Sequence, residues 1–178
     1  MLGLYDYHRP LRIVESQRWT EGSARALHVA RYYNGLGQLI QENTWNTSLA
    51  RMTVSSTAYN AQGLAATGYL PYETAYDPDY LPPSGGLDAV SQSYDALGRI
   101  TSVTQPDGSS MRTAYDGFEV AVLDADGYQI VSESDPLGRL VATREYTGTF
   151  GQVDWNAAAY ATTGYAYNPQ DLLVAVTD

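Results

Sequence analysis

The chain has 178 residues, a formal charge of −10 and no cysteine. The lack of cysteine excludes disulfides, thiolate metal sites and cysteine nucleophiles. The negative charge argues against nucleic acid or an anionic membrane surface as a partner, because either would be repelled. No apolar run approaches the roughly 18 residues of a membrane-spanning helix, so no membrane span is expected.

Tyrosine dominates the aromatic residues, with 16 Tyr against 3 Trp and 2 Phe. Tyr favours strands, and its hydroxyl needs water or a hydrogen-bond partner, so the composition predicts sheets whose ring-bearing face is only partly dry. The two histidines, His8 and His28, do not stand at a metal-binding spacing. We therefore expect no metal and no cofactor.

A short turn pattern recurs along the chain: an aromatic residue, then Asp or Asn, two variable residues and Gly. An Asp or Asn side chain accepts a hydrogen bond from the backbone two residues on, and a Gly with positive φ closes the hairpin. Full copies are Tyr33, Asn34 and Gly37; Tyr59, Asn60 and Gly63; and Tyr94, Asp95 and Gly98.

Degenerate copies and a second turn signal fill the spaces between the full copies. The degenerate copies are Tyr115 and Asp116 without the final Gly, Asp135 and Gly138 without the Tyr, Tyr167 and Asn168 with Asp171 in the Gly position, and a weak copy at Tyr7 and His8. The second signal is Pro106, Asp107 and Gly108 in one unit, and Asp124-Ala125-Asp126-Gly127, in which Asp126 and Gly127 are singled out, in the next. A basic unit of about 20 residues, with two strands and two turns, follows from these spacings.

The segments between the turns are rich in Thr, Val, Ile and Tyr, which predicts an all-β fold of stacked antiparallel hairpins with about ten to twelve strands. Predicted strands include 99–105, 110–115, 119–123, 128–134 and 140–146. Helix signals are nearly absent, and the candidates are 21–31 and one turn at 156–160. We expect a single array over residues 1–178, with units near 30–70, 87–146 and 165–178 and insertions near 71–86 and 146–164.

The run from Tyr94-Asp95-Ala96-Leu97-Gly98-Arg99 to Pro106-Asp107-Gly108 closely resembles the YD repeat, also called the RHS repeat. The resemblance implies a long sheet that curves and spirals into a hollow shell, as in bacterial RHS toxins, the B and C components of Tc toxins, and teneurins. In the bacterial proteins the shell encloses a C-terminal toxic domain.

The resemblance further implies a non-enzymatic wall segment of a secreted or cell-surface protein, although no signal peptide is recognisable. The expected partners are the remaining YD repeats of a longer chain and an enclosed toxin domain. Arg99 and Arg139 follow the turn Gly at equivalent places, and we expect each to pair with an Asp of the adjacent turn or to lie over a Tyr ring.

Alternative functions rest on three further features. Asp135-Pro136-Leu137-Gly138 resembles part of the aspartyl self-cleavage motif of the family, but Arg139 follows and an ordinary repeat turn is favoured. The Asp pairs at 124 and 126 and at 77 and 79 lack the further oxygen ligands of a calcium loop. The rings of Trp19, Trp45 and Trp155 could form a glycan-binding face of an adhesion module, although packing between strands is favoured.

Overall fold

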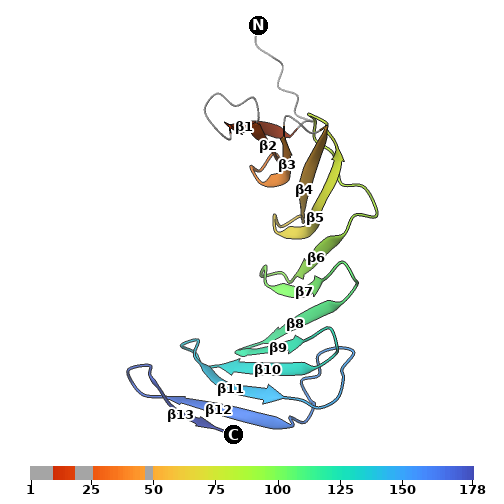
Figure 1. The fold of residues 1–178 in the computed structure, drawn as a ribbon. Helices are drawn as coiled ribbons and strands as arrows, with labels where there is room; N and C mark the ends of the chain where they lie inside the picture. Colours follow the sequence, from red (N-terminus) through yellow and green to blue (C-terminus); the bar gives the residue numbers. More distant parts are fainter. Residues whose placement is uncertain (1–9, 19–25, 47–49) are drawn as a thin grey trace. The chain divides into compact units, whose positions relative to one another are not determined.

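The computed structural model describes residues 10–18, 26–46 and 50–178, and these residues form thirteen strands and no helix (Figure 1). Sheet order follows chain order from β1 to β13, and every described pair is antiparallel. The chain divides into two compact units, Met1–Val90 and Ser91–Asp178. No helix that could cross a membrane occurs in the described part of the chain.

The strands are short, and in chain order their bounds are as follows. The first five are β1 (Leu11–Arg18), β2 (Ala26–Tyr33), β3 (Leu39–Asn46), β4 (Arg51–Tyr59) and β5 (Ala65–Ala75). The next four are β6 (Ala89–Tyr94), β7 (Ile100–Thr104), β8 (Ser110–Asp116) and β9 (Glu119–Leu123). The last four are β10 (Gln129–Ser134), β11 (Leu140–Glu145), β12 (Ala161–Tyr167) and β13 (Leu173–Thr177).

The predicted all-β hairpin fold is confirmed, and the predicted strands between residues 99 and 146 lie within a residue or two of β7 to β11. Both helix candidates are wrong where the structure describes them. Residues 26–31 belong to β2, because pairing with β1 on one side and β3 on the other outweighs local helix propensity. Residues 156–160 contain only turn and irregular backbone, and residues 21–25 and the weak copy at Tyr7 and His8 lie outside the described residues.

Within each unit, successive connections of such a meander alternate between the two ends of the strands, so the turns fall into two rows. The row that we call the YD row holds the turns after β2 and β4 in the first unit and those after β6, β8, β10 and β12 in the second. The other row holds the turns after β7 and β9 and the long connections 76–88 and 146–160. The predicted insertion at 71–86 therefore begins later than expected, since residues 71–75 still belong to β5.

In the first unit the connection 76–88 lies against β2 and β3. Tyr32 is 2% exposed and donates its hydroxyl hydrogen bond to the carbonyl of Pro78 at 2.8 Å. Gln41 is 1% exposed, and its side-chain amide donates to the carbonyl of Leu81 at 2.5 Å and accepts from the Leu81 N–H at 3.0 Å. A buried polar side chain is stable in such a place because the loop backbone satisfies it.

In the second unit the connection 146–160 covers a small apolar core. The core consists of Ala121, Val131 and Tyr146, and Phe150 and Trp155 pack against it. The ring of Phe150 meets that of Tyr146 edge to face, with centroids 6.2 Å apart. The long connections thus bury side chains that a single sheet layer would leave in water.

Candidate functional site: a ladder of capped turns

The turn at Asp95 shows the geometry that repeats along the chain. We number its five residues from position 1, the Asp, to position 5, Arg99. The N–H of Asp95 donates to the carbonyl of Arg99 at 2.9 Å, and the N–H of Gly98 donates to the carbonyl of Asp95 at 3.1 Å. The Asp95 carboxylate accepts from the N–H groups of Leu97 and Arg99, each at 2.9 Å. One side chain therefore satisfies two backbone donors that the hairpin ladder leaves free.

This arrangement, which we call a capped turn, recurs wherever Asp or Asn stands at position 1. The position 1 oxygen accepts from the N–H groups of positions 3 and 5 at distances between 2.8 and 3.0 Å. These capped turns begin at Asn34, Asn60, Asp95, Asp124, Asp135 and Asn168.

Position 4 has positive φ in each of these turns, which explains the glycine of the motif. The φ angles of Gly37, Gly63 and Gly98 are 76°, 78° and 79°. Asp171 takes the same conformation with φ 62°, and it is the one non-glycine residue with positive φ in the described part of the chain. Asp is among the few residues with a side chain that tolerate this conformation.

The two turns at the second turn signal have the same pair of backbone hydrogen bonds. One begins at Gln105, one residue before Pro106, and the other begins at Asp124, two residues before Asp126. Asp107 and Asp126 stand at position 3, and position 1 is held by Gln105 and Asp124. The predicted signal included Asp124 but not Gln105, which lies three residues before Gly108 and could have been found by that count. In the Gln105 turn, Asp107 itself accepts from the N–H of Ser109 at 2.9 Å.

The degenerate copy at Tyr115 and Asp116 is not a capped turn of this kind. Asp116 pairs directly with Glu119, so the hairpin closes with the two residues Gly117 and Phe118. Gly117 has φ 55°, as a tight two-residue hairpin turn requires. Position 4 of the longer turn would be Glu119 here, which is neither Gly nor one of the few other residues that readily take positive φ.

Three tyrosines of the motif, Tyr59, Tyr115 and Tyr167, join one hairpin to the next. The hydroxyl of Tyr115, at the end of β8, donates to the carbonyl of Ile100, the first residue of β7, at 3.0 Å. The corresponding bonds join Tyr59 to Leu39 at 2.9 Å and Tyr167 to Leu140 at 2.8 Å. In each case the acceptor is the residue directly after a capped turn.

The residue at position 5 provides a second link between neighbouring turns. The guanidinium carbon of Arg99 lies 4.1 Å from the ring centroid of Tyr115, and that of Arg139 lies 4.9 Å from the ring centroid of Tyr167. Each arginine also pairs with the Asp of its own turn, Asp95 or Asp135, at 2.7 Å. The expected ring contact thus occurs at both arginines, and it is accompanied by a pair with the Asp of the same turn, where an Asp of the adjacent turn was expected.

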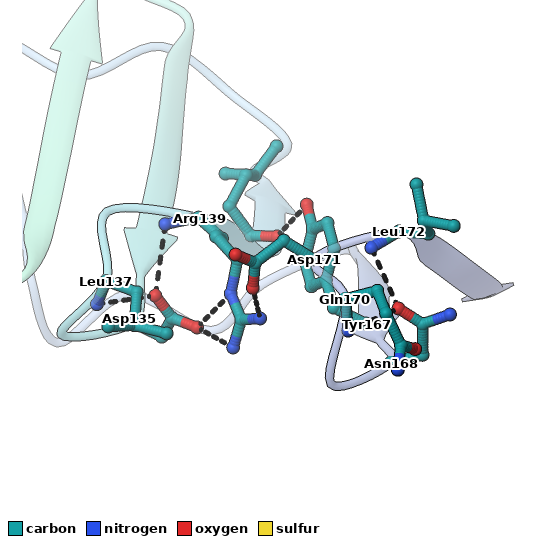
Figure 2. Close-up of polar contacts among 9 residues, drawn as sticks. Asp135, Leu137, Arg139, Tyr167, Asn168, Gln170, Asp171 and Leu172 are labelled. Atoms are coloured by element: carbon teal, nitrogen blue, oxygen red, sulfur yellow. Dashed lines mark hydrogen bonds and ion pairs between the residues drawn. The ribbon is translucent and has the colours of Figure 1, made fainter.

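Figure 2 shows that Arg139 reaches into the following turn as well. Its Nη1 donates to the Asp171 carboxylate at 2.6 Å. In the first unit Gln38 stands at the equivalent position, and its side-chain amide donates to the carbonyl of Gly63 in the next turn at 2.7 Å. Within each unit, these side chains therefore join neighbouring turns of the YD row in addition to the strand ladder.

These contacts hold the capping carboxylates in their charged form. The pKa of Asp95 is lowered, mainly because its carboxylate accepts the Arg99 N–H. The pKa of Asp135 is also lowered: burial alone would raise it, but the hydrogen bonds from Arg139 and Leu137 outweigh that effect. A carboxylate bound in this way is a poor proton donor, which fits a turn cap better than a self-cleaving aspartate.

The other candidate sites find structural roles among the described residues. The ring of Trp45 stacks on that of His28, with centroids 5.2 Å apart. It also contacts the tilted ring of Tyr76, with centroids 5.3 Å apart. Trp155 packs against the core of the second unit, so both rings are used in packing, whereas Trp19 lies outside the described residues. No group of three or more metal-ligating side chains forms within residues 10–18, 26–46 and 50–178.

One known family model matches a segment of the chain that contains these repeated turns. The family model described as RHS Repeat matches residues 94–129. The chain contains an RHS repeat. The matched segment spans the turns that begin at Asp95, Gln105 and Asp124, together with the two-residue turn at Gly117.

Solved structures share the fold around this RHS repeat. The crystal structure of TcdB2-TccC3 aligns with a TM-score of 0.70 and 18% identity, over 94% of this chain and 10% of that chain. The Photorhabdus luminescens Tc holotoxin pore aligns with a TM-score of 0.67 and 18% identity, over 93% of this chain and 10% of that chain. This chain spans about a tenth of those chains, and the likeness shows the fold. No curated protein matches the sequence significantly.

Proposed function

We propose that this chain is a non-enzymatic wall segment of an RHS-repeat shell. The observation that carries the proposal is the set of links between neighbouring turns of the YD row within each unit. The hydroxyls of Tyr59, Tyr115 and Tyr167 donate to the carbonyl of the residue that follows the preceding capped turn of that row, and Arg139 bridges two turns through Asp135 and Asp171. Repeat arrays are stabilised by such contacts between neighbours, and links of this kind suit a protein whose task is to keep a wall continuous.

The side chains of the repeat motif are occupied in a way that supports a mechanical role. Turn carboxylates accept backbone N–H groups, and the guanidinium groups lie over rings. A catalytic residue must instead present a free polar atom to a substrate within hydrogen-bond reach.

The wall segment would enclose or present a toxin or effector domain of a secreted protein. The neighbours in fold are Tc toxin structures, and one of them is described as lacking its hypervariable C-terminal region. A constant wall with a variable C-terminal region is the organisation expected of a container whose contents change. Enclosure would shield the contents from proteases and solvent.

The test uses the product of the complete gene that encodes these repeats. Limited proteolysis would compare the wild type with Gly98→Val, in which a β-branched residue must take φ 79°, and with the control Gly35→Ala at a turn position without positive φ. We expect the region C-terminal to the repeats to resist digestion in the wild type and the control, and to be cut faster in Gly98→Val. If that region is cut in the wild type as fast as when expressed by itself, the enclosure proposal is wrong.

A further inference from the structure

The turn that begins at Asn34 contains the single Asn-Gly pair of the sequence. Asn34 holds position 1 of this turn and Gly35 holds position 2, and Gly35 is exposed to solvent. The hydrogen bonds of the capped frame use the N–H groups of the other four residues of the turn, Asn34, Leu36, Gly37 and Gln38. The backbone nitrogen of Gly35 is therefore next to the Asn34 side chain without taking part in the frame.

A backbone nitrogen that follows an asparagine can react with the side-chain amide of that residue. A bond forms between the Gly35 nitrogen and Cγ of Asn34, the bond from Cγ to Nδ2 breaks, and ammonia leaves with the proton of the Gly35 nitrogen. Water then opens the succinimide ring at Cγ, which gives aspartate, or at the backbone carbonyl carbon, which gives isoaspartate. Glycine favours this reaction because it has no Cβ and a wide range of φ and ψ.

Two other capped turns begin with an asparagine and provide an internal comparison. Asn60 is followed by Ala61, whose Cβ restricts the approach, and Asn168 is followed by Pro169, whose nitrogen has no proton to release. In all three turns the asparagine oxygen accepts from the N–H groups of positions 3 and 5. A difference in reactivity among these turns is therefore expected to follow the residue at position 2.

The side-chain amide of Asn34 also sets the orientation of the Gln38 amide. Oδ1 of Asn34 accepts from the N–H groups of Leu36 and Gln38, each at 3.0 Å, so its Nδ2 is directed away from the backbone of the turn. That Nδ2 donates to Oε1 of Gln38 at 2.8 Å, and Nε2 of Gln38 donates to the carbonyl of Gly63 in the next turn at 2.7 Å. The Asn34 amide thus fixes which end of the Gln38 amide faces Gly63.

Loss of ammonia replaces a donor with an acceptor in this series of hydrogen bonds. The Gln38 amide, with its single NH2 group, then faces two acceptors, the new carboxylate and the carbonyl of Gly63. A charged acceptor binds a donor more strongly than a neutral one, so the NH2 group turns to the carboxylate. We propose that Asn34 is a site of spontaneous deamidation, and that its conversion releases the Gln38 link between the turns at Asn34 and Asn60.

The first test ages the chain as it is in mildly alkaline buffer and follows each asparagine by peptide mass spectrometry, in which both products are about 1 Da heavier. We expect Asn34 to convert before Asn60, and Asn168 to stay unchanged. Gly35→Ala should slow the conversion of Asn34 about 5-fold or more, because the conformational freedom of glycine is lost. Equal rates at Asn34 and Asn60, or no effect of Gly35→Ala, would overturn the assignment of the site.

The second test uses Asn34→Asp, which is the aspartate product, and reads the carbonyl carbon NMR shift of Gly63, which reports whether that carbonyl accepts a hydrogen bond. The capped frame should be kept, because Asp holds position 1 at Asp95 and Asp135. We expect the Gly63 shift of Asn34→Asp to match that of Gln38→Ala, in which the link is removed. The same shift should grow in as the unmodified chain ages.

An arginine at position 5 should restore the link. Arg139 pairs with the Asp of its own turn and also reaches Asp171 in the following turn. In an Asn34→Asp, Gln38→Arg double variant the Gly63 shift should therefore return toward the wild-type value. A Gly63 shift that Asn34→Asp leaves unchanged, or that Gln38→Arg does not restore, would overturn the proposed release.

Discussion

The side-chain amide of Gln129 pairs with both backbone groups of Asp154, much as one strand residue pairs with another. Its Nε2 donates to the Asp154 carbonyl at 2.9 Å, and its Oε1 accepts from the Asp154 N–H at 2.7 Å. Gln41 makes the same two bonds to Leu81 in the other unit. In each unit a buried glutamine therefore fixes a long connection to the sheet face.

Replacing Gln129 with Leu should release the connection 146–160. The substitution keeps the side-chain volume but leaves the N–H and carbonyl of Asp154 without their partner, a loss of about 1–3 kcal/mol. Limited proteolysis should show faster cleavage within 146–160, with the fluorescence of Trp155 shifted toward that of an exposed indole. The control is Gln152→Leu on the same connection, where the side chain is exposed. Equal cleavage of the two variants would show that Gln129 does not hold the loop.

The turn at Asn34 offers a test of backbone conformation without a change in packing. Gly37 has φ 76° and Gly35 does not have positive φ, and a Cβ at either position meets nothing within 4 Å. Gly37→Ala should therefore destabilise the fold by about 1–2 kcal/mol, whereas Gly35→Ala should be neutral or slightly stabilising. Thermal unfolding followed by circular dichroism compares the two. A similar midpoint for both variants would mean that the capped frame is not maintained in solution.

The hairpin fold and most of the turns could be predicted because their causes are local. An Asp or Asn followed three residues later by a Gly is nearly sufficient to predict a capped turn. The turn at Asn168 has Asp171 in place of the Gly and was still recognised as a copy of the pattern. The prediction failed at Asp116, where the fourth position holds Glu119 and the chain closes a shorter turn instead. At the second turn signal the prediction included Asp124 to Gly127 but singled out Asp126, whereas Asp124 occupies position 1.

The docked connections could not be predicted from the sequence. Gln41 bonds to Leu81, 40 residues away, and Gln129 bonds to Asp154, 25 residues away. Neither glutamine belongs to a repeat motif or to a regular apolar pattern, so nothing local distinguishes them from exposed glutamines. The link from Arg139 to Asp171 depends in the same way on the pairing of distant strands.

Stability should fall with pH in the acid range because capping carboxylates are bound in their charged form. The pKa of Asp95 and that of Asp107 lie below the ordinary 3.8, through the N–H of Arg99 and the hydrogen bonds of Ser109 respectively. A lowered pKa in the folded state means that this stabilisation is complete above about pH 4. It is lost as the pH falls below 3.8 toward the folded-state pKa.

An Asp95→Asn, Asp135→Asn double variant isolates this effect. Asn caps the equivalent turns at positions 34, 60 and 168, so the frame should be kept while the titrating groups are removed. We expect a lower unfolding temperature at pH 7, because the pairs with Arg99 and Arg139 are lost, and a shallower decline between pH 5 and pH 2. The same slope as the wild type would show that these carboxylates do not govern the acid response.

Arg144 forms ion pairs with two glutamates, Glu119 and Glu133, that lie opposite each other on the adjacent strands β9 and β10. Glu119 pairs directly with Glu133, and Arg144 Nη2 lies 2.6 Å and 2.5 Å from their carboxylates. Like charges directly opposite are unfavourable, so Arg144→Met should cost about 1–3 kcal/mol at pH 7. These side chains are about one-quarter to two-fifths exposed, and solvent screening places the expected value in the lower half of that range.

Two comparisons complete that test in denaturant unfolding. Adding Glu133→Gln to Arg144→Met should recover part of the loss, because it removes the repulsion. Arg51→Met removes an exposed pair with Glu73 at 3.3 Å and should cost under about 1 kcal/mol. If Arg144→Met costs no more than Arg51→Met, the cluster does not stabilise the sheet.

Amide hydrogen exchange at the turns tests most directly whether capped turns hold the hairpins of the array. Leu97 and Leu137 are 78% and 73% exposed, yet their N–H groups donate hydrogen bonds to the carboxylates of Asp95 and Asp135. We predict that these two amides exchange at least about tenfold more slowly than in an unstructured peptide, and that Asp95→Ala removes the protection at Leu97 but not at Leu137. Exchange at the unstructured rate at both amides in the wild-type chain would contradict the capped-turn ladder.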